Sequence, residues 1–146
     1  DFGLAGTTED ARRQHFTVDT ISGTPGYTCP SYIQTGRVSE QSEAYSFGIV
    51  MLELLVNQPP ALLGPNGDMF YPLLQTVQPA VPRAFDRITA NLDRVAGWHT
   101  EVVAMVGDLA LSCVDMVPER RPVFQSMVQV LRHLCQTGGC AGGGGG

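Results

Sequence analysis

Asp1-Phe2-Gly3 opens the sequence, and three further motifs follow it in order. They are Gly23-Thr24-Pro25-Gly26-Tyr27, Ser42-Glu43-Ala44-Tyr45-Ser46-Phe47-Gly48 and Pro118-Glu119-Arg120-Arg121-Pro122. A lone Asp-Phe-Gly is weak evidence, because three residues recur by chance and an aspartate before an apolar residue is common in turns. Four motifs in this order are a far more specific signal, and they decide the fold class.

The ordered set resembles the second half of a protein kinase domain. In that family Asp-Phe-Gly carries the magnesium-binding aspartate, and the segment from it to the Ala-Pro-Glu position is the activation loop. Trp98, Ala110-Leu111-Ser112-Cys113 and Arg121-Pro122 resemble the ending of plant receptor-like and interleukin-receptor-associated kinases. The resemblance covers about residues 1–136 and places the chain in the tyrosine-kinase-like group.

This resemblance implies a mainly α fold, the helical C-terminal lobe of a protein kinase. The glycine-rich loop, the strand lysine and the His-Arg-Asp catalytic loop all precede Asp-Phe-Gly in kinases. We therefore expect a fragment that lacks the N-terminal β lobe and the catalytic loop. Its partial kinase domain, 1–137, divides into an activation loop at about 1–38 and a helical lower lobe at about 39–137. The glycine-rich tail at 138–146 is expected to be disordered, because it cannot offset its ordering entropy by burying side chains.

The composition is that of one globular domain. With 146 residues and 43% hydrophobic content, the chain is long enough to bury a core. Nine Lys plus Arg against 14 Asp plus Glu give a net charge of −5, which argues against nucleic acid as a partner. The longest apolar run, around residues 49–56, falls short of the roughly 20 residues of a membrane span. We expect a cytoplasmic protein or the cytosolic part of a membrane receptor.

The four cysteines do not predict a metal site or a disulfide framework. Cys29, Cys113, Cys135 and Cys140 form no Cys-x-x-Cys pair and have no histidine at ligand spacing. Reduced thiols are therefore expected.

The strongest periodic signal is a central helix at residues 39–57. Its residues are apolar on nearly every face, which predicts a helix that is buried all round. Ser39 or Ser42 is the expected N-cap, with Glu40 and Glu43 near the positive end of the helix dipole.

The segments on either side of this helix lack sustained periodicity. Residues 4–38 are predicted to be a long loop, and a loop of that length indicates a regulated segment. Prolines and glycines punctuate residues 59–82, which leaves room only for short helices such as one near residues 73–77.

Two more helices are expected toward the C-terminus. Thr100 is the predicted cap of a helix that runs to about Val114. A second helix follows Pro122, which suits a first turn. Its predicted apolar stripe is Phe124, Met127, Val128, Leu131 and Leu134 or Cys135. In the isolated chain the central helix would be partly uncovered, so we expect poor solubility.

Asp1 matches the family aspartate that holds Mg²⁺, a hard cation that prefers oxygen ligands. The resemblance implies ATP and Mg²⁺ as cofactors of the parent kinase, and a protein substrate and the missing N-terminal half of the domain as partners. No catalytic residue is intact in this chain, and we expect neither cofactor to bind it tightly. A frayed terminus is the competing interpretation of Asp1.

Gly23-Thr24-Pro25-Gly26-Tyr27 resembles the segment that receives the peptide substrate and favours Ser or Thr acceptors. Thr24 would hydrogen-bond the catalytic aspartate of an intact enzyme, and Gly26 and Tyr27 complete the loop. Two glycines and a proline in five residues also make an ordinary tight turn.

Thr17, Thr20 and Ser22 lie where activation-loop phosphosites occur in such kinases. Arg12 and Arg13 are the nearby cations that a phosphate would attract. For each hydroxyl the alternative is a solvated polar residue of a loop.

Two departures from the family pattern stand out. Cys29-Pro30-Ser31 replaces Ala-Pro-Glu, so the glutamate that would pair with Arg121 is a serine, and Arg121 must find another acceptor. Glu43 replaces an aspartate that reaches the catalytic loop, and its extra methylene shifts the carboxylate by more than about 1 Å. The alternative for Glu43 is a carboxylate that complements the helix dipole.

The leading interpretation is a fragment of a protein kinase whose parent transfers the ATP γ-phosphoryl group to Ser or Thr of protein substrates. The fragment alone is expected to be inactive. Ser31 and Glu43 motivate a second hypothesis, a pseudokinase that binds partners without chemistry. A truncated gene model is the third.

Overall fold

The computed structural model describes residues 15–77 and 81–137. Asp1, Arg12, Arg13, Cys140 and the glycine-rich tail lie outside these residues. In chain order the elements are β1 (His15–Thr17), α1 (Pro30–Thr35), β2 (Arg37–Ser39), α2 (Glu40–Val56), β3 (Leu62–Leu63), β4 (Met69–Phe70), α3 (Pro72–Val77), α4 (Ala84–Ala90), α5 (Thr100–Cys113), the 3₁₀ turn η1 (Pro118–Arg120) and α6 (Phe124–Thr137). The expected mainly α fold is confirmed.

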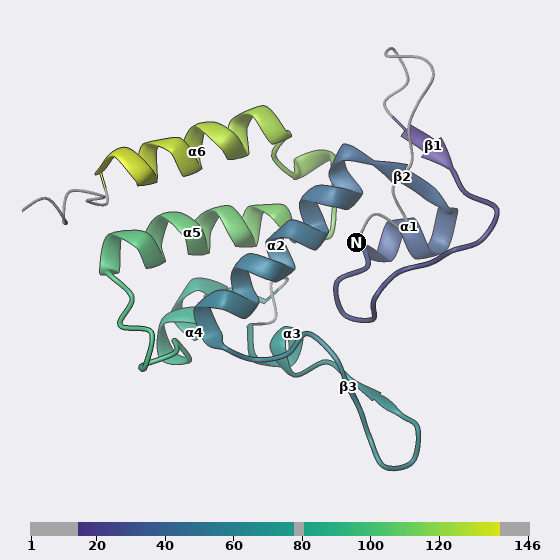
Figure 1. The fold of residues 1–146 in the computed structure, drawn as a ribbon, viewed down its shortest axis with the longest axis horizontal. Coiled ribbons are helices and arrows are strands. Elements are labelled where there is room, and N and C mark those ends of the chain that lie inside the picture. The colour runs from purple at the N-terminus through teal and green to yellow at the C-terminus, as the bar shows by residue number, and fades with distance from the viewer. Residues whose placement is uncertain (1–14, 78–80, 138–146) are drawn as a thin grey trace, which may run out of the picture.

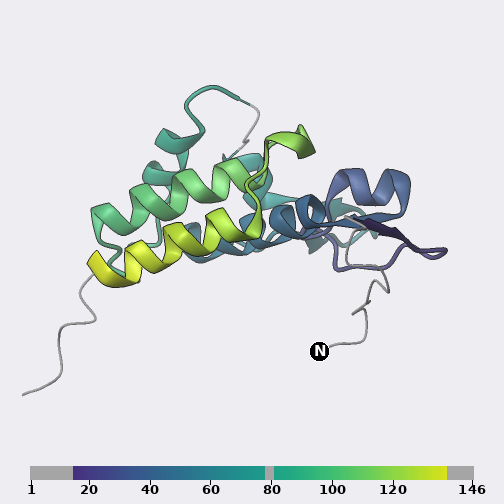
Figure 2. The same cartoon turned by 90° about the horizontal axis from the view of Figure 1, so that it is seen from above.

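Helix α2 organises the molecule (Figure 1). It packs most extensively against α5, which lies beside α6, and its C-terminal half also contacts α3 and α4. The two views agree that β1, β2 and α1 gather at the N-terminal end of α2 (Figures 1 and 2). The first pocket described below lies at this end, and the 24–27 turn extends along α2 as far as Glu53.

A capping box formed by Ser39 and Ser42 stabilises the start of α2. The Ser42 amide donates to Ser39 Oγ at 3.2 Å, and the Ser39 amide donates to Ser42 Oγ at 2.9 Å. Two of the otherwise unpaired amides at the helix start are thereby satisfied. Asn57 ends the helix in the left-handed conformation, with φ of 53°. The expected bounds and N-cap are confirmed.

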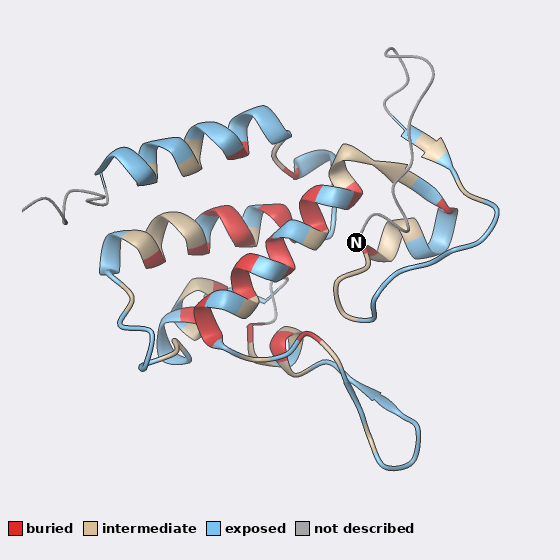
Figure 3. Ribbon diagram, in the orientation of Figure 1, coloured by how far each residue is buried: buried red, intermediate tan, exposed pale blue. Residues whose placement is uncertain are grey.

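The hydrophobic core forms along α2, where it meets α5, α3 and α4 (Figure 3). Ile49, Leu52 and Leu55 of α2 are each at most 1% exposed. Apolar burial of this kind contributes roughly 2 kcal/mol for each large side chain.

The prediction that α2 is buried all round is wrong. Phe47, Val50 and Leu54 are 38%, 37% and 60% exposed. These residues follow the 3.6-residue period and lie on one face with Glu43. The exposed stripe agrees with the expectation of a partly uncovered helix in the isolated chain.

Two segments contain more structure than their patterns predicted. Within the expected loop, β1 pairs with β2 in antiparallel register, and α1 lies between them. The segment between α2 and α3 holds the hairpin of β3 and β4, and α4 follows α3. The short helix near residues 73–77 is confirmed as α3. Strands of two or three residues leave no periodic signal, which explains why they were missed.

Both C-terminal helices form, but their starts differ from the prediction. The N-cap of α5 is His99, whose carbonyl accepts the Val103 amide at 3.0 Å, so Thr100 is its first residue. Helix α6 begins at Phe124, and Pro122 lies outside it. The predicted stripe of α6 is only partly covered: Met127 is buried, whereas Phe124 and Val128 are exposed.

Candidate functional site

Residues 24–27 form a tight turn at the surface. The Tyr27 amide donates to the Thr24 carbonyl oxygen at 3.2 Å, and Gly26 has φ of +88°. Proline in the second position and a positive-φ glycine in the third are typical of a type II turn. A Cβ on Gly26 would lie 2.7 Å from the Pro60 carbonyl carbon, so space as well as φ requires glycine. The side chain of Thr24 stays exposed.

A side-chain hydrogen bond fixes this turn to α2. The Tyr27 hydroxyl donates to Glu53 Oε2 at 2.5 Å. This bond, together with burial and the negative charge of Glu53, raises the pKa of Tyr27 to about 12. The phenol therefore remains a donor throughout the physiological pH range. The sequence did not predict this contact of Glu53, although a glutamate inside the apolar run of residues 49–56 is a visible signal.

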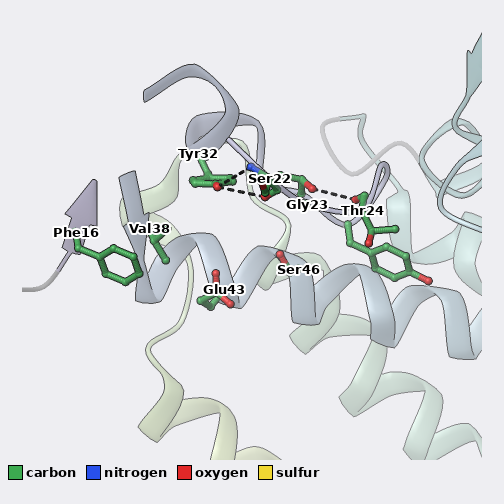
Figure 4. Close-up of a pocket in the computed structure, with 10 residues that line it drawn as sticks. Phe16, Ser22, Gly23, Thr24, Tyr32, Val38, Glu43 and Ser46 are labelled. Carbon is green, nitrogen blue, oxygen red and sulfur yellow. Dashed lines mark hydrogen bonds between the residues drawn. The ribbon is translucent and has the colours of Figure 1, made fainter. Parts of the chain in front are cut away.

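An open pocket of about 490 Å³ lies beside the turn. Figure 4 shows Glu43 on α2, between Phe16 and Val38 on one side and Thr24 on the other. Glu43 is exposed, and within the described part of the chain it forms no hydrogen bond or ion pair. Its carboxylate lies in the first turn of α2 and faces solvent, where it complements the helix dipole.

A second open pocket, of about 460 Å³, shares residues of the turn with the first. No side chain that lines it carries a charge. The lining residues are Ile21, Gly23, Pro25, Gly26, Thr28, Pro30, Ile33, Tyr45, Tyr71 and Leu74. The turn therefore has an acidic group in one neighbouring pocket and a largely apolar surface in the other.

The three hydroxyl residues before the turn are exposed. Thr17 lies on β1 directly opposite Arg37 of β2, whose Nη2 is 2.8 Å from His15 Nε2. The Ser22 backbone amide donates to the Tyr32 hydroxyl, and this hydroxyl donates to the Ser22 carbonyl, each at 3.2 Å. Thr20 lies in the loop between Thr17 and Ser22. Among the described residues, Arg37 is therefore the cation that lies across from the predicted phosphosite Thr17.

Arg121 is buried and does find other acceptors. Its Nε donates to the Asp115 carbonyl at 2.8 Å, and its Nη1 donates to the Gln41 carbonyl at 2.9 Å and to Cys29 Sγ at 3.0 Å. The guanidinium also lies 5.0 Å from the centre of the Tyr45 ring. The sequence predicted Cys29 to be a reduced thiol in the Cys29-Pro30-Ser31 segment, but it did not predict the contact of this thiol with Arg121.

Comparison with known families agrees with this geometry. The protein kinase domain model matches residues 1–133. The chain belongs to the protein kinase family. Because the match covers most of the chain, the helical bundle around α2 is the C-terminal lobe of the kinase fold.

Curated plant kinases are similar to this kinase chain over most of its length. A probable LRR receptor-like serine/threonine-protein kinase of Arabidopsis thaliana is 33% identical over 94% of this chain and 15% of its own length. The probable serine/threonine-protein kinase PBL18 of the same plant is 33% identical over 92% of the chain and 34% of its own length. An EPD1-interacting receptor-like cytoplasmic serine/threonine-protein kinase of Nicotiana benthamiana is 32% identical, over 93% and 29% respectively. The chain thus spans about a third or less of these relatives.

Among the helices of residues 15–77 and 81–137, none has the length and apolar character that crossing a bilayer requires. The same residues contain no group of three or more His, Cys, Asp or Glu side chains placed to hold a metal ion. Asp1, the magnesium ligand implied by the motif, lies outside the described residues.

Proposed function

We propose that the chain is the substrate-receiving helical part of a protein serine/threonine kinase, whose parent transfers the ATP γ-phosphoryl group to a protein hydroxyl. The observation that carries the proposal is the 24–27 turn, which Tyr27 and Glu53 fix to α2 while Thr24 stays exposed. Phosphoryl transfer depends mainly on positioning and charge stabilisation, so a rigidly held acceptor segment matters for rate. The serine/threonine kinases among the relatives support the proposed acceptor class.

The described residues would contribute positioning to this reaction. Tyr27 holds the turn against α2, and Thr24 would reach the catalytic aspartate of the parent. ATP and Mg²⁺ belong to the parent's chemistry, in which the ion neutralises charge on the phosphates. No described residues fit a magnesium site, so we assign no step to the metal here.

We expect the 146-residue chain to be inactive by itself. Kinases use a lysine on the nucleotide phosphates and the aspartate of His-Arg-Asp. This sequence contains no lysine and no His-Arg-Asp motif. We further propose residues 1–38 as the activation loop, residues 39–137 as the lower lobe, and a cytoplasmic location for the parent.

The pseudokinase alternative rests on one specific observation. Glu43 is exposed and forms no hydrogen bond or ion pair in the described part, although the family aspartate at this position orders the catalytic loop. A longer acidic side chain that fails to order this loop would leave a binding module without chemistry.

A chimera separates the two functions. Residues 1–137 are fused behind the N-terminal half of the PBL18 kinase domain, and ATP- and Mg²⁺-dependent phosphorylation of a generic protein acceptor is measured by phosphoamino-acid analysis. We expect phosphoserine and phosphothreonine from the chimera, and none from the chain alone or from a chimera whose catalytic aspartate is replaced. An inactive chimera that Glu43→Asp activates would establish the pseudokinase alternative instead. Phosphotyrosine as the main product would refute the proposed acceptor class.

A further inference from the structure

Arg121 is the one buried charged side chain among residues 15–77 and 81–137, with 5% exposure. A buried guanidinium is costly unless it is paired, so its acceptors are important for stability. Two of them, at Gln41 and Asp115, are neutral backbone carbonyls. The third, the Cys29 sulfur, is the acceptor that can itself carry a negative charge.

The surroundings of Cys29 suit this role. Its side chain is 1% exposed, and its sulfur lies 3.0 Å from both Arg121 Nη1 and Ser31 Oγ. A thiol would donate its proton to the Ser31 hydroxyl, whereas a thiolate would accept the proton of that hydroxyl. Ser31 can therefore satisfy the sulfur in both protonation states, while Arg121 favours the charged one.

We propose that Cys29 and Ser31 together replace the glutamate of Ala-Pro-Glu, with the Cys29 sulfur as the anionic partner of Arg121. This pair joins positions 92 residues apart in the chain. It fastens the start of α1, two residues after the 24–27 turn, to the segment before α6. Cys29 is thus a positioning residue for the turn, an assignment that goes beyond the proposed kinase function and can be tested without kinase activity.

The charges around the pair support the assignment. Burial, the largest influence, raises the pKa of Cys29, but hydrogen bonds with Ser31 and Tyr32 and the hydrogen bond and charge of Arg121 together lower it below its usual value. Two other ionisable groups near Arg121, Tyr45 and Cys113, behave in the opposite way. Burial, and then the charge on Cys29, raise the pKa of Tyr45, and burial raises the pKa of Cys113 to about 11. Both stay neutral at pH values at which Cys29 ionises.

The lowered pKa fixes the direction of the pH dependence. A thiol that ionises more readily in the folded state contributes stability that is fully present above the unfolded pKa, near 8.5. This contribution is lost as pH falls through the folded pKa. Between about pH 7 and 9 the stability due to Cys29 should therefore increase with pH. Cys113 acts in the opposite sense from about pH 8.5 upward, because its folded pKa is raised to about 11 while the unfolded thiol ionises near 8.5.

The first experiment compares urea unfolding of four forms of the full chain between pH 7 and 9. Cys29→Ala should lower the folding equilibrium constant about 10- to 100-fold more than the matched buried control Cys113→Ala, because it removes a hydrogen bond to a charged group. It should also abolish the increase in stability with pH, which Cys113→Ala should retain. Cys29→Ala/Ser31→Glu should recover stability without that increase, because a glutamate is ionised throughout this range. Equal losses in the two alanine variants, or no recovery in the double variant, would overturn the proposal.

A second measurement does not depend on the folding of the Cys29 variant. The form Cys113→Ala/Cys135→Ser/Cys140→Ser keeps Cys29 alone, and its thiolate absorbance near 240 nm is titrated in buffer and in urea. We expect a lower midpoint in the folded protein than in the unfolded one. A folded midpoint equal to or above the unfolded value would refute the anionic role of Cys29.

Discussion

Replacing Gly48 by alanine tests the packing of α2 on α5, which positions Glu43 and Glu53 at the site. A Cβ at this position would lie 2.6 Å from Cys113 Cβ, 2.8 Å from Val114 Cγ1 and 3.1 Å from the Ala110 carbonyl oxygen. These atoms belong to α5 and its C-cap and include backbone. Relief therefore requires the two helices to separate rather than one side chain to rotate.

The expected change in the free energy of unfolding of Gly48→Ala follows from two opposing effects. Alanine is favoured over glycine in a helix by about 1 kcal/mol. Forcing an extra methyl group into a close-packed core costs about 1–3 kcal/mol, and contacts this short place Gly48→Ala at the upper end. We expect a net loss of about 2 kcal/mol in the free energy of unfolding.

Gly107 of α5 provides the matched comparison. Its added Cβ would lie 2.9 Å from Phe85 Cε2, and the three nearest atoms from outside its own helix backbone all belong to side chains. Since the half-buried Phe85 ring can turn away, the gain in helix propensity should roughly offset the contact, and Gly107→Ala should change stability by less than about 1 kcal/mol.

Urea unfolding of both variants, followed by circular dichroism at 222 nm, gives the two free energies. The slope of free energy against urea should be unchanged if only stability differs. If Gly48→Ala is as stable as the original chain, or if Gly107→Ala loses as much as Gly48→Ala, the close approach of α2 and α5 described here is incorrect.

Further predictions concern the turn and the exposed stripe. Tyr27→Phe should lower the free energy of unfolding by about 1.5 kcal/mol at pH 7. This is the lower end of the range for a hydrogen bond to a charged group, because water can replace the phenol at the partly exposed Glu53. Since the pKa of Tyr27 is raised to about 12, this stabilisation is complete below pH 10 and disappears as pH rises from 10 to 12. Urea unfolding and the ultraviolet titration of the phenols measure both effects, and an unchanged titration would contradict the assignment. Leu54→Gln, at a 60% exposed position, should leave stability within about 0.5 kcal/mol and reduce self-association in light scattering, whereas the control Leu55→Gln, at a 1% exposed position, should unfold the chain. Undiminished self-association of Leu54→Gln would show that the exposed stripe is not the cause.

The sequence alone was sufficient for the family, the mainly α class and the bounds of α2. The apolar residues along residues 39–57 and the serine cap are local features, and local sequence encodes them directly. The ordered motifs identified the family because their order and spacing are far less frequent by chance than any one of them. The starts of α5 and α6 were displaced by one or two residues, because several neighbouring residues are compatible with the first turn.

The tertiary structure alone decided which face of α2 is exposed and which groups meet at the site. Phe47, Val50 and Leu54 are as apolar as the buried residues of α2, so only the placement of neighbouring helices distinguishes them. Likewise, no local pattern pairs Cys29 with Arg121 or Tyr27 with Glu53. These contacts join residues 92 and 26 positions apart, and they exist because the packing of separate elements brings them within hydrogen-bonding distance.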